Sequence, residues 1–106
     1  MSISQYVQGD LIDCPMSFTD VNGVLIDPST VEFNFTCGGY GPIKWTYAGS
    51  STATTGTVWR VSQGIFRARV DSTPFYGLFQ GAGIAKGTGQ SAALISFMVI
   101  QNPLLP

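Results

Sequence analysis

The chain has 106 residues, of which 44% are hydrophobic and 10% are charged, with a formal net charge of -1 and no histidine. This length suits one domain with its own core, and the hydrophobic content excludes a disordered chain. The low charge argues against nucleic-acid binding, and the absence of histidine excludes Ser-His-Asp and Cys-His nucleophiles. We therefore expect no enzyme, no catalytic residue, no cofactor and no metal.

The N-terminal residues have neither the basic region nor the apolar region of a secretory signal. The longest apolar run, residues 92–100, is shorter than the ~20 residues that a membrane helix requires. We therefore expect a soluble protein, made in a reducing cytoplasm and not bound to a membrane. Cys14 and Cys37 are then small buried hydrophobic residues, and a disulfide between them is the alternative.

Short segments of alternating apolar and polar residues, separated by glycine, proline and serine, are typical of strands. Seven strands are predicted, over residues 10–19, 31–37, 43–47, 58–62, 65–70, 75–81 and 91–101. The fold class is therefore all-β, an antiparallel β-sandwich of about seven strands, with a small barrel as the alternative. The sandwich is expected to span residues 9–101, between an N-terminal arm (1–8) and a C-terminal tail (102–106).

The same alternation predicts which side chains enter the core. The inward-facing residues of the first two strands are Ile12, Cys14, Met16, Phe18, Val31, Phe33, Phe35 and Cys37. Pro15 indicates that the first strand lies at a sheet edge, since proline donates no ladder hydrogen bond. Trp45 and Trp59 are interpreted as further core anchors.

Three groups of residues are candidate chemical sites. Residues 81–89 are rich in glycine, but we interpret them as a flexible hairpin connection because no helix follows to bind a phosphate. Asp20, Asn22 and Gly23 match part of a calcium loop, but a turn is favoured because further ligands are missing. Enzymatic activity would need two carboxylates to converge, for instance those of Asp13 and Asp71.

Three arginines provide the only basic cluster. Arg60, Arg67 and Arg69 are predicted to share one exposed sheet face, since their strands are expected to form a hairpin. Pairing with Asp71 or Glu32, or contact with a protein partner, is favoured over nucleic-acid binding for such a small patch.

The chain has more apolar residues than a single small sandwich is expected to bury. The last predicted strand is apolar on both faces, and apolar residues also occur in both terminal segments. A subunit covered by neighbours can expose such a surface, whereas the alternative is a central strand covered by its own sheets. The residues that we expect at a partner interface are Tyr6, Val7, Leu94, Phe97, Val99, Leu104 and Leu105.

The order of the turn motifs is informative: Gly-Asp at 9–10, FTDVNG at 18–23, DPSTV at 27–31 and VWRVSQGIF at 58–66. Over roughly residues 9–101, this order resembles the small immunoglobulin-like proteins encoded among the head and tail genes of tailed bacteriophages. The resemblance implies an immunoglobulin-like sandwich that is a virion structural protein, made in the host cytoplasm. Such a protein would dock on capsid, portal–neck or tail subunits through apolar surfaces and terminal arms, as a homo-oligomer or multi-copy assembly.

The alternative function is that of a carbohydrate- or receptor-binding module. In this hypothesis an exposed aromatic platform stacks against a ligand, and its candidates are Trp45, Tyr47, Trp59 and Tyr76.

Overall fold

The computed structural model describes residues 5–86 and 92–105, without the side chains of residues 92 and 93. The described residues form eight strands and are all-β. The strands are β1 (Gln5–Val7), β2 (Leu11–Ser17), β3 (Thr30–Cys37), β4 (Tyr40–Thr46), β5 (Val58–Ser62), β6 (Ile65–Asp71), β7 (Gly77–Lys86) and β8 (Ala92–Ile100).

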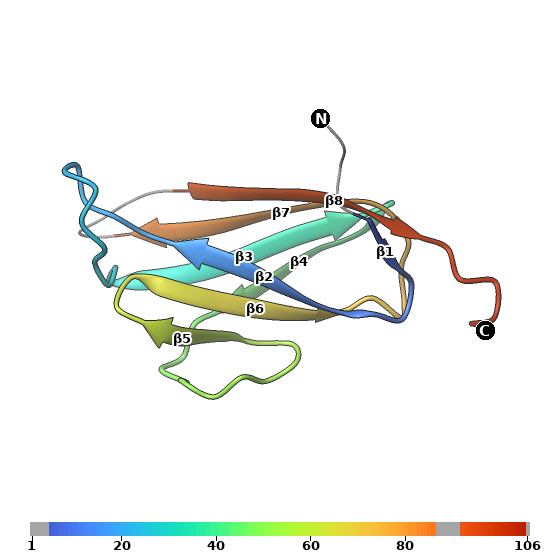
Figure 1. The fold of residues 1–106 in the computed structure, drawn as a ribbon, viewed down its shortest axis with the longest axis horizontal. Helices are drawn as coiled ribbons and strands as arrows, with labels where there is room; N and C mark the ends of the chain where they lie inside the picture. Colours follow the sequence, from blue (N-terminus) through green and yellow to red (C-terminus); the bar gives the residue numbers. More distant parts are fainter. Residues whose placement is uncertain (1–4, 87–91, 106) are drawn as a thin grey trace.

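The strands form two sheets that pack against each other as a β-sandwich (Figure 1). One sheet has five strands in the order β1-β8-β7-β3-β4, and the other has three in the order β2-β6-β5. Neighbouring strands are antiparallel except for β1 and β8, which are parallel. Strand β2 lies at a sheet edge, which confirms the prediction made from Pro15.

The N-terminal residues differ from the expected arm. Instead of lying outside the sandwich, Gln5–Val7 form β1 and pair with β8 of the same chain, with Tyr6 opposite Val99. The Gln8 N–H extends the pairing by donating to the Ile100 carbonyl at 2.8 Å. The prediction of an arm is therefore wrong for residues 5–8, and residues 1–4 lie outside the described residues.

The predicted flexible connection over residues 81–89 is wrong for its first six residues, because β7 continues to Lys86. Gly81 and Gly83 face the core, and a Cβ added to Gly83 would lie 2.6 Å from the sulfur of Met16 on β2. These glycines therefore give neighbouring side chains room where the two sheets pack. Residues 87–89 of the predicted connection lie outside the described residues.

The core contains the inward-facing residues that the alternation predicts. All eight of the predicted side chains are at most 4% exposed: Ile12, Cys14, Met16, Phe18, Val31, Phe33, Phe35 and Cys37. Trp45 is half-buried and packs against this core. Trp59 is buried as predicted, but it lies outside the main core cluster.

An aromatic row crosses the inner face of the five-stranded sheet, with one ring from each strand. Tyr6 (β1) contacts Phe97 (β8) at a centroid distance of 4.9 Å, and Phe97 stacks on Phe79 (β7) at 4.2 Å. Phe79 stacks on Phe35 (β3) at 5.1 Å, and Phe35 meets Trp45 (β4) at 5.2 Å. The row joins the N-terminal strand to the opposite edge of the sheet and fixes the five strands as one layer.

The fully buried Ser72 stabilises the segment that connects β1 to β2. Its hydroxyl accepts from the Gly9 N–H at 2.9 Å and donates to the Asp10 carbonyl at 2.8 Å. The C-terminal tail begins beside this connecting segment, where the Asn102 N–H donates to Oε1 of Gln8 at 3.2 Å. Strand β1 and the start of the C-terminal tail therefore lie at the same end of the sandwich (Figure 1).

Candidate interaction surface

The two carboxylates considered for catalysis are engaged in ordinary surface contacts. Arg69 donates from Nε to Asp13 at 2.7 Å, and the Thr73 hydroxyl donates to Asp71 at 2.6 Å. These hydrogen bonds lower the pKa of Asp13 and the pKa of Asp71. A carboxylic acid that acts as a general acid near neutral pH needs a raised pKa. The lowered pKa values of Asp13 and Asp71 are the opposite of this requirement.

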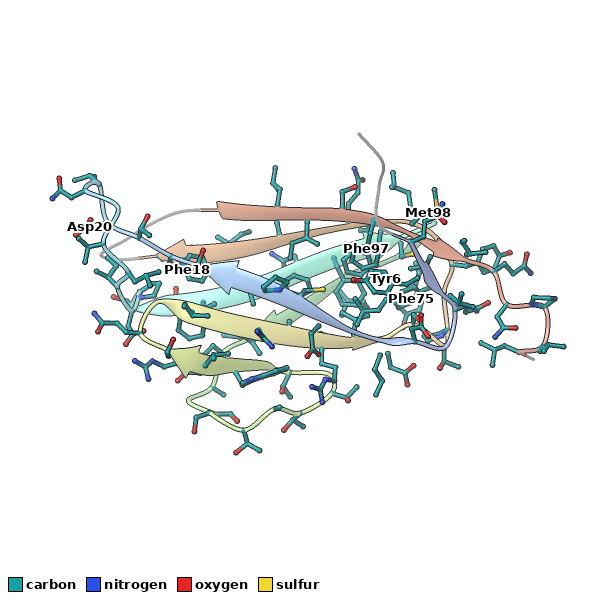
Figure 2. The ribbon with its side chains drawn as sticks, viewed as in Figure 1. Tyr6, Phe18, Asp20, Phe75, Phe97 and Met98 are labelled. Carbon is teal, nitrogen blue, oxygen red and sulfur yellow. The ribbon has the colours of Figure 1, made fainter. Side chains whose placement is uncertain are left out.

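The Asp20 motif is a turn, as predicted. One Asp20 carboxylate oxygen accepts from the backbone N–H groups of Asn22 at 2.8 Å and Val24 at 3.1 Å. The carboxylate therefore stabilises its own loop at one end of the sandwich, where Figure 2 labels it. Within the described ranges, the chain has no group of three or more Cys, Asp or Glu residues placed to hold a metal ion.

The three arginines do not form one patch. Arg67 lies opposite the outward-facing Trp59, whereas Arg60 lies opposite the inward-facing Phe66. Strands β5 and β6 do pair as predicted, but adjacent residues of β5 point to opposite sides. The shared face predicted for the arginines is therefore wrong for Arg60.

Most of the charged side chains on the strands pair within the chain. Among the described residues, ion pairs join Arg69 to Asp13 at 2.7 Å, Arg60 to Asp27 at 3.0 Å and Lys44 to Glu32 at 3.4 Å. The arginine partners predicted from the sequence, Asp71 and Glu32, are therefore wrong. The Arg69 guanidinium carbon also lies 5.3 Å from the centroid of the Trp59 ring, so a cation–π contact covers this tryptophan.

The seven residues expected at a partner interface divide between the core and the surface. Phe97 and Val99 are 3% and 1% exposed and Tyr6 packs on Phe97, so these three side chains stabilise the chain's own core. Figure 2 shows Tyr6 and Phe97 gathered with Phe75 between the sheets, and Met98 on the outside.

The remaining members of that set lie at the surface. Val7, Leu94 and Leu104 are 45%, 85% and 90% exposed, while Leu105 is half-buried. Leu105 lies beside Gly9, where a Cβ would be 3.3 Å from its Cδ1. Of the strand side chains that the structure describes, Leu94 is thus the most exposed apolar one, and Leu104 belongs to the tail.

The outer side of β1, β8 and β7 carries several apolar residues, and the polar residues Gln5, Gln80 and Ser96 also lie on it. We call this surface the outer sheet face, and its apolar residues are Val7, Leu78, Ala82, Ile84, Leu94, Met98 and Ile100. Five of these residues were not among the predicted interface residues. The sequence contained a signal for them, because every second residue of β7 and β8 faces the same side of the sheet.

A shallow hollow of about 370 Å³ opens on the outer sheet face beside Leu94. Its lining includes Ala82 of β7, Asn34 and Thr36 of β3, and Pro42 of β4. Leu94, Ala82 and Asn34 are adjacent across three strands, because Leu94 pairs with Ala82 and Ala82 pairs with Asn34. A protruding leucine and an apolar hollow therefore lie side by side on one surface.

The four aromatic residues considered as a ligand platform do not form one. Trp45 packs on Phe35, and Tyr47 contacts Phe66 at a centroid distance of 5.0 Å. Trp59 is 5% exposed. These three rings serve packing, which leaves Tyr76 as the exposed member of the predicted set.

Tyr76 takes part in a different feature at one end of the sandwich. A hollow of about 200 Å³ is lined by Tyr40, Pro74, Phe75 and Tyr76. Tyr40 and Tyr76 are 40% and 50% exposed, and the Tyr40 ring lies 5.2 Å from that of Phe75. Two tyrosines thus border a small concave site that the sequence did not indicate.

Comparison of the chain with protein-family models, curated proteins and solved structures finds no match. In the part of the chain that the structure describes, no helix is long and apolar enough to cross a membrane.

Proposed function

We propose that this chain is a non-enzymatic structural protein of a tailed-bacteriophage virion, which docks on neighbouring subunits through the outer sheet face. The observation that carries the proposal is the group of exposed apolar side chains on the outer side of β1, β8 and β7, where Leu94 is 85% exposed. Monomers rarely keep such a surface in water, because covering it is favourable by ~25 cal/mol per Å² of apolar area.

The strand order supports an immunoglobulin-like arrangement for this subunit. The sheet β2-β6-β5 corresponds to strands B, E and D of that fold, and β8-β7-β3 corresponds to strands G, F and C. Strands β4 and β1 then extend the second sheet at its two edges. This correspondence agrees with the fold implied by the resemblance of the turn motifs at 9–31 and 58–66 to phage immunoglobulin-like proteins.

The polar groups support a structural role. The carboxylates of Asp13, Asp27 and Asp71 accept hydrogen bonds within the chain, and the thiols of Cys14 and Cys37 are buried. These side chains stabilise the sandwich and are not gathered in a cleft. A docking protein needs a stable scaffold with an exposed contact surface, which this arrangement provides.

The test is the content of purified virions. Particles of the phage that encodes the chain would be banded by density and analysed by quantitative mass spectrometry and immunogold labelling. We expect the chain at a fixed number of copies per particle, at the capsid surface, neck or tail. A phage carrying Leu94→Asp should package fewer copies, while Leu104→Asp serves as a control outside the outer sheet face. Absence of the wild-type chain from the particles would contradict the proposal.

A second candidate function is carbohydrate or receptor binding at the hollow between Tyr40 and Tyr76. The supporting observation is that two exposed tyrosine rings border a concave site of about 200 Å³, and aromatic rings stack on the apolar faces of sugars. A glycan array should then give a hit that Tyr76→Ala abolishes and Tyr47→Phe preserves. If the folded protein binds no glycan on the array, this second candidate function is wrong.

A further inference from the structure

We propose that Asn22 is a site of spontaneous deamidation in the folded protein, and that the carboxylate of Asp20 sets the rate of this modification. The inference goes beyond the proposed function, because it concerns the loop between β2 and β3, at the end of the sandwich where Figure 2 labels Asp20. Asn22 is exposed and is followed by Gly23. The backbone nitrogen of a glycine can attack the preceding side-chain amide readily, since glycine has no Cβ to block the approach.

The reaction joins groups of two adjacent residues and consumes only water. The Gly23 nitrogen loses its proton and attacks Cγ of Asn22, and the side-chain nitrogen takes up a proton from solvent and leaves as ammonia. The product is a succinimide ring, which water opens at one of its two carbonyl carbons. Cleavage of the bond between Cγ and nitrogen leaves aspartate at position 22. Cleavage of the bond from the backbone carbonyl carbon leaves isoaspartate, with the main chain running through the former side chain.

The surroundings of Asn22 leave room for this reaction. Among the hydrogen bonds of the described residues, those of Asn22 involve its backbone N–H, and none restrains its side-chain amide. The loop is also open around the next residue, because a Cβ added to Gly23 would have no atom within 4 Å. The side chain of Asn22 can therefore turn toward the nitrogen of Gly23 without displacing a neighbour.

The other two asparagines of the chain are protected by their positions. Asn34 lies within β3 and pairs with Lys44 on one side and with Ala82 on the other, so the sheet fixes its backbone. Asn102 is followed by a proline, whose nitrogen has no proton to lose. Its side chain is also held, because Nδ2 donates to the Gln8 carbonyl at 3.3 Å. The structure therefore distinguishes Asn22 from both of them.

Asp20 restrains the attacking nitrogen. Its backbone carbonyl accepts from the Gly23 N–H at 3.1 Å, and this hydrogen bond has to break before the nitrogen loses its proton. The Asp20 carboxylate keeps the turn closed, because one of its oxygens accepts from the N–H groups of Asn22 at 2.8 Å and Val24 at 3.1 Å. Deamidation therefore proceeds from a locally opened turn, and its rate follows the fraction of molecules in which the turn is open.

The first experiment locates the modification. The full chain is incubated without denaturant at mildly alkaline pH, in water enriched in heavy oxygen, and its peptides are mapped by mass spectrometry. We expect deamidation at Asn22 long before Asn34 or Asn102, with one heavy oxygen in each product and with both aspartate and isoaspartate present. An Asn22→Asp variant gives the chromatographic standard for the aspartate product. Reaction of Asn34 as fast as Asn22 would overturn the assignment of the site.

The second experiment tests the role of Asp20. The variant Asp20→Ala should deamidate at Asn22 roughly fivefold faster or more, because it loses two hydrogen bonds to a charged acceptor. Asp20→Asn keeps an acceptor oxygen and should stay closer to wild type. Asp71→Ala is the matched control, since the Asp71 carboxylate also accepts from a backbone N–H two residues on, that of Thr73. It should leave the rate at Asn22 unchanged, and circular dichroism verifies the fold of each variant.

The rate in urea provides the reference for a fully open turn. We expect the folded wild type to react at Asn22 more slowly than the unfolded chain, and folded Asp20→Ala to approach the unfolded rate. A folded wild type in which Asn22 stays intact while it reacts in urea overturns deamidation in the folded protein. Equal rates for folded wild type and folded Asp20→Ala overturn the role of the Asp20 carboxylate.

Discussion

The rings of Tyr6 and Phe97 form a T-shaped contact, with centroids 4.9 Å apart and the ring planes at 71°. This contact brings the N-terminal strand into the core, because Phe97 is 3% exposed and stacks on Phe79. Residues 5–7 therefore form a strand of the sandwich in addition to the seven predicted from the sequence, and they cover one end of the core.

The first prediction is that Tyr6→Ala destabilises the protein by about 1–3 kcal/mol, since it removes a partly buried ring from the aromatic row. Tyr6→Phe keeps the ring and should stay close to wild type, and Val7→Ala, on the exposed side of β1, should change little. Urea denaturation gives the free energies of unfolding. Equal stabilities for wild type and Tyr6→Ala would mean that β1 does not contribute to the core.

The second prediction concerns Gly83, which has no room for a side chain because Met16 lies over it. Gly83→Val should cost about 1–3 kcal/mol of stability by overpacking. Gln80→Val is the control, since Gln80 is exposed on the other side of the same strand. Both variants are compared by the midpoint of urea denaturation, and a loss for Gln80→Val as large as that for Gly83→Val would remove the steric explanation.

A double-mutant cycle sharpens this prediction. Met16→Ala alone should cost about 2–5 kcal/mol by leaving a cavity. Combined with Gly83→Val, it should cost less than the two single losses together, because the valine fills space that the methionine vacates. Strict additivity of the two changes would show that the residues do not compete for the same space.

The third prediction is a dependence of stability on pH. Hydrogen bonds from Arg69 to Asp13, from Arg60 to Asp27 and from Thr73 to Asp71 lower the pKa of each carboxyl in the folded chain. The unfolded chain, with an aspartate pKa of about 3.9, then binds more protons than the folded chain at acidic pH. Stability should be fully present above about pH 5 and fall toward about pH 2.

One variant isolates the contribution of Asp13 to this dependence. Asp13→Asn should flatten the decline of the free energy of unfolding below about pH 5, because Arg69 no longer holds a charged partner. Leu11→Asn, at a neighbouring exposed position of β2, should leave the slope unchanged. Identical acid profiles for Asp13→Asn and wild type would show that this ion pair does not stabilise the fold.

The fourth prediction is that the two native thiols are unreactive in the folded protein. Burial, assisted by the charge of Asp13, raises the pKa of Cys14 to about 12, and burial raises the pKa of Cys37. Because only the thiolate attacks, iodoacetamide at about pH 8 should modify both thiols only as fast as the chain unfolds. Mass spectrometry follows the reaction.

The matched control is Ser17→Cys, which places a thiol on the exposed side of the strand that carries Cys14. The introduced thiol should react within the native state. Rapid native modification of Cys14, or an intact mass two hydrogens lower, would contradict burial as free thiols.

Much of the fold was predictable because alternation is a local property. The buried series from Ile12 to Phe18 and from Val31 to Cys37 follow directly from it, and the predicted bounds of β5 match the structure. The strand predicted to end at residue 81 continues as β7 to Lys86, through Gly83, which the sequence prediction did not assign to a strand. Gly81 and Gly83 are also typical of turns, and their role in packing depends on Met16, which lies distant in the sequence.

The sequence alone determined an all-β fold with two hydrophobic faces, since a two-residue period requires no knowledge of distant partners. Only the tertiary structure decided that Tyr6 and Phe97 point inward while Val7 and Leu94 point outward. Strand β8 is apolar on both sides, so its pattern contains no record of which side faces the core. That choice depends on the pairing of β8 with β1 and β7, because paired strands form one sheet with two faces. The three-stranded sheet covers only one of these two faces.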